Sequence, residues 1–174
     1  MFAKMEGKMT NQTSTINPAT PPVNTHSFSM PQSAAVLAYA GALPLIVAVL
    51  CIILKPEPWG SGALEFMAIY GGLLIAFFGG VRWGVAVMRA QGPTFRHLLG
   101  GVLPLIVAAP ILVLDDIGVR LMLIVIALPV LLFDDLKATK RGSGAPEWYL
   151  GVRMPLTILM EFSFIIALAM QFTF

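Results

Sequence analysis

Long apolar runs alternate with short polar segments along most of the chain. An α-helix rises 1.5 Å per residue, so crossing about 30 Å of hydrocarbon takes roughly 20 residues. Five runs reach or approach that length, and we predict membrane spans at about residues 33–54, 62–88, 98–114, 117–133 and 150–172. The predicted fold class is therefore all-α: a polytopic membrane protein folded as a compact bundle of five transmembrane helices.

The fourth run is the shortest, because only the stretch from Leu121 to Phe133 lacks charge. Starting the span at Ile117 gives a sufficient length if the long side chain of Arg120 reaches outward to the membrane surface. Two acidic pairs, Asp115-Asp116 and Asp134-Asp135, flank this run. We expect both pairs to cap helix ends.

The first 32 residues differ from the rest of the chain. They are rich in Asn, Thr, Ser and Pro and show no periodic apolar face. Such a segment buries too little surface to offset its ordering entropy, so we predict a disordered polar tail over 1–32. The membrane domain then covers 33–174.

Composition agrees with a lipid environment. Hydrophobic residues make up 57% of the chain and charged residues only 11%, whereas soluble domains carry about 25% charged residues. The formal net charge of +2 is small and shows no clustered basic face, so nucleic-acid binding is not expected. The single cysteine, Cys51, excludes an intramolecular disulfide. The expected partner is the lipid bilayer.

The basic residues predict an orientation. Cytoplasmic loops of membrane proteins carry an excess of Lys and Arg. With five spans, Lys55 and Arg120 fall on one side of the membrane. The other side holds Lys4, Lys8, Arg89, Arg96, Lys137, Lys140, Arg141 and Arg153. This bias places the N-terminus inside and the C-terminus outside.

A short element repeats in the first and third spans. The segments 41–48 and 101–108 differ at one position only, and each contains a proline, Pro44 or Pro104. A weaker copy surrounds Pro155 in the fifth span. Proline removes a helical hydrogen bond, so a hinge or a kinked cavity wall is one interpretation of these positions. We favour the other, that they are ordinary prolines of membrane helices without a functional role.

Small residues recur every fourth position in the second span. They are Ala68, Gly72, Ala76, Gly80 and Gly84. Residues four apart share a helix face, and small ones let a second backbone approach closely. We therefore predict a helix-packing stripe that places the second span at the centre of the bundle, with a homodimer seam as the alternative.

Two charges, Arg82 and Glu161, are singled out as intramembrane by their depth within the predicted spans. Arg82 enters from the predicted cytoplasmic side, and Glu161 lies near the middle of the fifth span. Ionisable groups at such depth are paired, protonated or functional. An Arg82–Glu161 ion pair with a structural role is our first hypothesis. A proton or ion relay and a protonated, unpaired Glu161 are the alternatives.

Motifs of known chemistry are missing from the sequence. It holds no GxSxG, HExxH or GxGxxG motif, and Cys51 and His97 fall near opposite membrane faces. No catalytic residue, metal site or cofactor is predicted. We expect a non-enzymatic accessory or assembly protein that contacts other membrane proteins, in an oligomeric state that the sequence leaves open. The alternative is a small transporter or proton-conducting protein that uses Arg82 and Glu161.

The second span also carries a family resemblance. The segment 70–84, YGGLLIAFFGGVRWG, resembles the signature of transmembrane protein 69-like proteins, a family of unknown function numbered 3429. The resembling positions are Tyr70, Gly71, Gly79, Gly80, Trp83 and Gly84, supported by Trp148, Tyr149 and Arg153. The resemblance covers about residues 34–172. It implies a multi-span fold in the bacterial inner membrane, or alternatively the mitochondrial inner membrane, and no particular activity.

Overall fold

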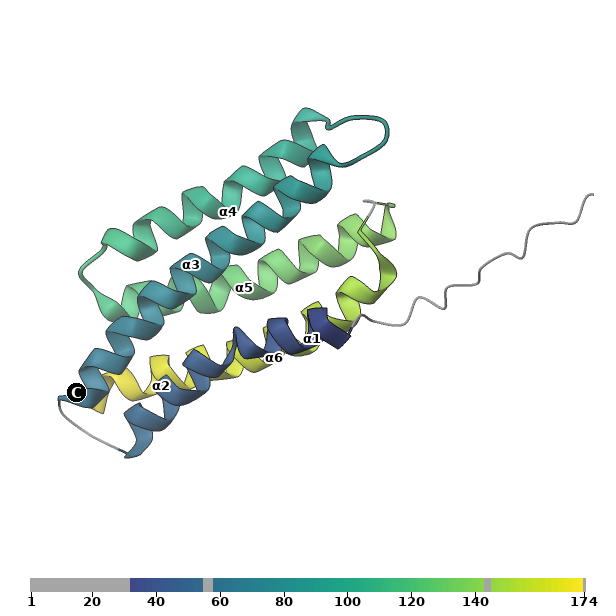
Figure 1. Cartoon of the computed structure of the whole chain (residues 1–174). Helices are drawn as coiled ribbons and strands as arrows, with labels where there is room; N and C mark the ends of the chain where they lie inside the picture. The colour runs from purple at the N-terminus through teal and green to yellow at the C-terminus, as the bar shows by residue number, and fades with distance from the viewer. Residues whose placement is uncertain (1–31, 55–57, 143–144, 174) are drawn as a thin grey trace, which may run out of the picture.

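Long, mostly apolar segments and short polar connections produce a bundle of long antiparallel helices (Figure 1). A computed structural model describes residues 32–54, 58–142 and 145–173. The elements are α1 (Gln32–Ala40), α2 (Leu43–Leu54), α3 (Trp59–Val87), α4 (Phe95–Val113), α5 (Ile117–Lys140), α6 (Glu147–Met170) and the 3-10 turn η1 (Gln171–Thr173). The predicted disordered tail lies outside the described residues, apart from Gln32.

The predicted all-α fold is confirmed. Five helical segments are long and apolar enough to cross a membrane, and α1 and α2 together form the first of them, Gln32–Leu54. The fourth, Ile117–Lys140, continues beyond the predicted end at residue 133. The acidic pair Asp134-Asp135 therefore lies inside α5, and the prediction that it caps a helix end is wrong. Asp116 does cap α5, where its side chain accepts a hydrogen bond from the Val119 N–H at 3.0 Å.

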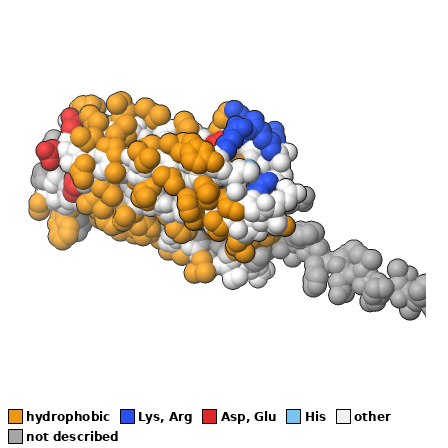
Figure 2. Space-filling view, turned by 90° about the horizontal axis from the view of Figure 1, so that it is seen from above, with side chains coloured by type: hydrophobic (Ala, Val, Ile, Leu, Met, Phe, Trp, Pro, Cys, Tyr) orange, Lys and Arg blue, Asp and Glu red, His pale blue; other side chains and the backbone are white. Residues whose placement is uncertain are grey.

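The two ends of the bundle differ in charge. Lys and Arg side chains gather at one end and acidic side chains at the other, with hydrophobic side chains over the surface between them (Figure 2). We call the first the basic end; it carries Arg89, Arg96, Lys137, Lys140 and Arg141. The described chain enters the bundle at the basic end, with α1, and finishes at the opposite end, with η1 (Figure 1).

Helix α3 occupies the centre, as predicted from its small residues. It packs against α2, α4 and α5 and also contacts α6. Gly79 and Gly101 mark the closest approach of α3 and α4, since a Cβ at Gly79 would lie 2.7 Å from the Gly101 carbonyl oxygen. A Cβ at Gly101 would in turn lie 3.0 Å from the Trp83 backbone. Glycine is needed at this crossing because no side chain fits between the backbones.

The predicted stripe does not pack as one continuous face. Ala68 and Gly72 are buried, and Gly72 faces Ile111 and Leu112 of α4. Gly80 is exposed, and neither Gly80 nor Gly84 has an atom within 4 Å of where a Cβ would lie. Each step of four residues turns about 40° past a full helical turn, so four steps rotate the stripe by about 160°. Seven residues fall only about 20° short of two full helical turns, so Gly72 and Gly79 both lie against α4.

The repeated proline element has different effects in its three copies. The first span breaks at Gly41 and Ala42, just before Pro44. In α4 and α6 the helix continues through Pro104 and Pro155. A proline in sequence therefore does not by itself predict a break, because neighbouring helices decide whether the freed backbone groups find other partners.

Candidate functional site

Three charged side chains lie at the same depth inside the basic end. Arg82 is five residues from the end of α3, Asp135 five residues from the end of α5, and Arg153 six residues from the start of α6. At 1.5 Å per residue, each lies about 8–9 Å inside its helix. Neighbouring spans run in opposite directions, so equal counts from the basic end bring the three side chains to one level.

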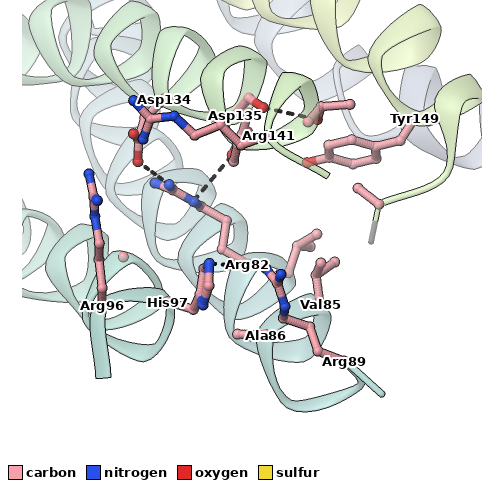
Figure 3. A pocket seen from close by; sticks show the side chains of 15 residues that line it. Arg82, Val85, Ala86, Arg89, Arg96, His97, Asp134, Asp135, Arg141 and Tyr149 are labelled. Carbon is pink, nitrogen blue, oxygen red and sulfur yellow. Dashed lines mark hydrogen bonds and ion pairs between the residues drawn. The ribbon is translucent and has the colours of Figure 1, made fainter. Parts of the chain in front are cut away.

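These side chains form a connected cluster around Asp135. The Arg82 Nε atom lies 3.2 Å from Asp135 Oδ1, and the Arg153 Nε atom lies 3.3 Å from Asp135 Oδ2. Arg82 also pairs through its Nη2 atom with Asp134 (Figure 3). Asp135 thus links α3, α5 and α6 through one carboxylate. Shared pairing of this kind offsets the desolvation cost of charges buried within a bundle.

Arg153 is the most deeply enclosed member of the cluster. Its side chain is 2% exposed, and its guanidinium lies 3.3 Å above the centre of the Phe78 ring. Arg153 Nη1 donates to Thr157 Oγ1 at 2.9 Å, and the Thr157 hydroxyl donates to the Arg153 carbonyl. The aromatic face, the hydroxyl and the carboxylate together hold the cation in one geometry.

The cluster contradicts the predicted Arg82–Glu161 pair. Arg82 is bound to Asp134 and Asp135, and Glu161 lies elsewhere, in a groove between α5 and α6. Glu161 is thirteen residues past Trp148, about 20 Å further along α6, whereas Arg82 lies near the basic end. The predicted pair assumed the wrong acidic partner, because Asp134 and Asp135 had been assigned to a helix end.

A second ion pair, between buried Arg120 and half-exposed Glu65, lies toward the opposite end. Arg120 is 4% exposed, and its Nη1 atom contacts both Glu65 carboxylate oxygens, at 2.7 and 2.8 Å. Its Nε–H donates to the Ile111 carbonyl at 2.7 Å, near the C-terminus of α4. The prediction that Arg120 extends outward is therefore wrong. The Glu65 carboxylate and a free helix-end carbonyl hold it inside the bundle.

A pocket opens beside the cluster at the basic end. Its volume is about 280 Å³, and its walls come from α3, α4, α5, the segment after α5 and the start of α6 (Figure 3). Arg82, Asp134, Asp135 and Tyr149 face it together with Arg89, Arg96, His97 and Arg141. In the described parts of the chain, no group of three or more His, Cys, Asp or Glu side chains is placed to hold a metal ion. The groups in this pocket that can bind a ligand are the guanidinium groups of its arginines.

The part of the chain that matches a known family includes the helices that form this region. The model of the family described as "Protein of unknown function (DUF3429)" matches residues 30–169. The chain belongs to this family. No solved structure matches the DUF3429 chain. The narrower transmembrane protein 69-like assignment stays a prediction.

The signature residues of this DUF3429 chain divide into three groups by position. Tyr70 donates its hydroxyl to the Gly41 carbonyl at 2.7 Å, and Gly71 lies against Ile124 and Phe164. Near the basic end, Gly79 and Trp83 form the crossing with α4, and Tyr149 lines the pocket. Arg153 belongs to the cluster around Asp135, and Trp148 is half-buried. A Cβ added at Gly80 or Gly84 would meet no atom of another described helix within 4 Å.

Sequence reasoning missed the role of Asp135 and the burial of Arg153 inside the bundle. A signal for both was present, because each charge interrupts an apolar run at nearly the same distance from the basic end. Using that signal requires the true end of α5, which the charge-free stretch understated by seven residues.

Proposed function

We propose that this membrane protein is a non-enzymatic accessory protein that binds a transmembrane helix of a partner along the groove between α5 and α6. The observation that carries the proposal is the unpaired carboxyl group of Glu161. The coarser description, a DUF3429 member with five candidate membrane spans, stands independently of this proposal.

Glu161 lies near the middle of its span. It is thirteen residues after Trp148 and nine before Met170, so about 20 Å and 14 Å from the two ends. The groove it lines has a volume of about 200 Å³. Its other lining residues are Pro129 and Leu132 of α5 and Thr157, Ile158, Phe162 and Ile165 of α6.

The Glu161 carboxyl group lacks a partner within the described part of the chain. Its Oε2 atom is buried and makes no hydrogen bond. By contrast, Glu65, Asp134 and Asp135 each pair with an arginine. A buried polar group without a partner costs about 1–3 kcal/mol, and the hydrocarbon core offers no water to compensate.

A partner helix with a hydrogen-bond donor at mid-membrane depth fits this groove. The groove is open, and apart from Glu161 and Thr157 its lining residues are apolar, with Ile158, Phe162 and Ile165 available for helix packing. An Arg, Lys, Asn, Gln, Ser or Thr side chain would supply the hydrogen bond that Oε2 lacks. Packing and one polar contact are the forces that associate helices in lipid.

The alternative function loses its basis. A transporter or proton-conducting protein was inferred from an Arg82–Glu161 pair, and Arg82 instead pairs with Asp134 and Asp135. Between the charged clusters at the two ends, the buried side chains are mostly apolar, including Ile75, Ile124 and Leu128. No observation favours a conduction path.

We further propose that the basic end faces the cytoplasm, with the N-terminus inside and the C-terminus outside. The excess of Lys and Arg at that end supports this orientation. The bacterial inner membrane, or alternatively the mitochondrial inner membrane, is the location that the family resemblance implies. Reporter fusions at the two chain ends test the orientation, and equal signals from both ends would contradict it.

Site-specific photocrosslinking tests the partner proposal. A photoreactive amino acid is placed at Ile158 or Ile165 in the groove, and at Ile126, an exposed position of α5 outside it, as the control. In native membranes, we expect a protein adduct of one defined mass from the groove positions only. Glu161→Leu should abolish that adduct and Glu161→Gln should retain part of it, with the abundance of the chain unchanged. Adducts that persist in Glu161→Leu, or lipid adducts alone, would overturn the proposal.

A further inference from the structure

The pocket at the basic end carries more positive charge than the bundle itself neutralises. Four arginines and two aspartates line it, which leaves a formal excess of two positive charges with His97 neutral. Arg82 is neutralised by Asp134 and Asp135. Arg89, Arg96 and Arg141 have no carboxylate within ion-pair distance in the described part of the chain. Three guanidinium groups at one pocket are therefore available to an external anion.

Arg89 is oriented toward this space by a neighbouring histidine. Its Nη1 atom lies 3.0 Å from His97 Nε2 (Figure 3). Because a guanidinium can only donate, Nε2 accepts this hydrogen bond and the ring proton resides on Nδ1. Nδ1 then donates to the Thr94 hydroxyl oxygen at 2.6 Å. The two linked hydrogen bonds from Arg89 to His97 to Thr94 use one of the N–H donors of Arg89 and leave the others for a ligand.

The two aspartates do not repel an anion as unpaired carboxylates would, because each is paired with an arginine. Asp135 is 5% exposed and is shared between Arg82 and Arg153, and Asp134 is bound by Arg82. Arg153 adds one more positive charge behind the pocket wall, although it does not line the pocket. The acidic groups thus hold arginines in place, and the net field in the pocket is positive.

Both the size and the depth of the pocket suit a lipid head group. A volume of about 280 Å³ lies just below the range for pockets that hold drug-sized ligands, about 300–1,000 Å³, and suits a smaller group. Arg82 lies about 8 Å inside α3, while Arg96 and Arg141 are exposed beyond it. Trp83, Trp148 and Tyr149 belong to the same end, at the level where aromatic rings meet lipid head groups.

We propose that this pocket binds a phosphate group, supplied by the head group of an anionic phospholipid. Guanidinium groups match phosphate oxygens with paired hydrogen bonds, and basic pockets between membrane helices are suited to anionic head groups. Val81, Val85, Ala86 and Ala138 form the apolar part of the wall, against which the glycerol region of the lipid packs. The site is separate from the α5–α6 groove and does not depend on the proposed partner.

The test uses the full chain, purified in a non-ionic detergent and depleted of lipid. Its thermal unfolding is followed while phosphatidylglycerol, phosphatidylcholine or inorganic phosphate is added, and lipid binding is measured by native mass spectrometry. We expect phosphatidylglycerol to raise the Tm and to bind at least tenfold more tightly than phosphatidylcholine. The double substitution Arg96→Gln with Arg141→Gln should weaken phosphatidylglycerol binding by about tenfold for each arginine removed.

The matched control is Lys137→Gln with Lys140→Gln. Both lysines belong to the same end of α5 and neither lines the pocket. This control should bind phosphatidylglycerol like the unsubstituted chain. None of the four side chains forms an ion pair in the described structure, and Lys137 makes a cation–π contact only with the exposed Phe133 ring, at 4.2 Å. Both double variants should therefore keep nearly the Tm of the lipid-free chain.

Three outcomes would overturn the proposal. Equal weakening by the lysine and arginine substitutions would mean that general surface charge binds the lipid. Equal affinity for phosphatidylcholine would remove the requirement for an anion. A Tm increase with inorganic phosphate as large as that with phosphatidylglycerol would overturn the lipid as the source of the phosphate.

Discussion

Tyr70 of α3 donates its hydroxyl to the carbonyl oxygen of Gly41, at 2.7 Å, where the first span breaks. The Leu45 N–H donates to Ala42 instead of Gly41, so the Gly41 carbonyl has no helical partner. The Tyr70 hydroxyl takes that place. A break in one membrane helix is thus satisfied by a side chain of the central helix, as the absence of water in the bilayer core requires.

Removing this hydroxyl should destabilise the bundle. Tyr70→Phe leaves the Gly41 carbonyl without its donor, and we expect a loss of about 1 kcal/mol. Tyr39→Phe is the control, since Tyr39 is 39% exposed and its hydroxyl forms no hydrogen bond with the described residues. Thermal unfolding in mild detergent measures both. Equal Tm values for the two variants would show that the Gly41 carbonyl finds another donor.

Two adjacent glycines should respond in opposite ways to alanine. Gly79→Ala places a methyl group 2.7 Å from the Gly101 carbonyl oxygen, so α3 and α4 must separate, at a cost of about 1–3 kcal/mol. Gly80→Ala meets no atom within 4 Å and gains helix propensity, so its stability should be equal or higher. Unfolding temperatures of the two variants give the comparison. A marked loss of stability in Gly80→Ala would instead indicate a contact with a second copy of the chain.

Asp135 is expected to be the most sensitive acidic residue. Asp135→Asn removes the charge shared by Arg82 and Arg153 and leaves Arg153 buried without a counter-ion, at a cost of about 3–5 kcal/mol. The control is Asp115→Asn, an exposed position outside the cluster. Membrane abundance and Tm report the effect. Wild-type stability of Asp135→Asn would contradict a central role for the shared carboxylate.

Substitutions of the two members of the Arg120–Glu65 ion pair should have unequal effects on stability. Arg120→Met removes the guanidinium that pairs with Glu65 and also the donor to the Ile111 carbonyl, whereas Glu65→Gln keeps an acceptor on a side chain that is 49% exposed. Glu65→Gln leaves the buried Arg120 without its counter-ion, but the glutamine oxygen still accepts from Nη1 and the site is half-exposed to its surroundings. We therefore expect the arginine substitution to cost about 1–3 kcal/mol and the glutamate substitution less. Unfolding of the two single variants tests the order. The reverse order would mean that the Ile111 carbonyl does not depend on Arg120.

The span count and the central position of α3 were predictable because both depend on local properties. Apolar length sets which segments cross a bilayer, and small side chains set how closely helices approach. The candidate site was less accessible to sequence reasoning. Arg82 was recognised as an intramembrane charge, but its partners lie 52 and 53 positions further along the chain, in a helix whose end the charge-free stretch placed too early.

Prolines and small residues likewise separate what the sequence predicts from what the packing of the helices decides. Pro44 and Pro104 have almost identical neighbours in sequence, yet only the first lies beside a break, where Tyr70 supplies a hydrogen bond from another helix. The five-member stripe predicted one packing face, and helical rotation carried Gly80 and Gly84 away from it. Spacing identifies candidate contacts, and the positions of the neighbouring helices decide which of them form.

By itself, the sequence determined that this chain is an all-helical protein with five candidate membrane spans, because hydrophobic transfer is roughly additive along a chain and needs no partner. Only the tertiary structure decided which charges meet, which carbonyls need a donor and which carboxyl group stays unpaired. Those outcomes depend on atoms within about 4 Å of each other, and such proximity arises from the angles and offsets at which helices pack.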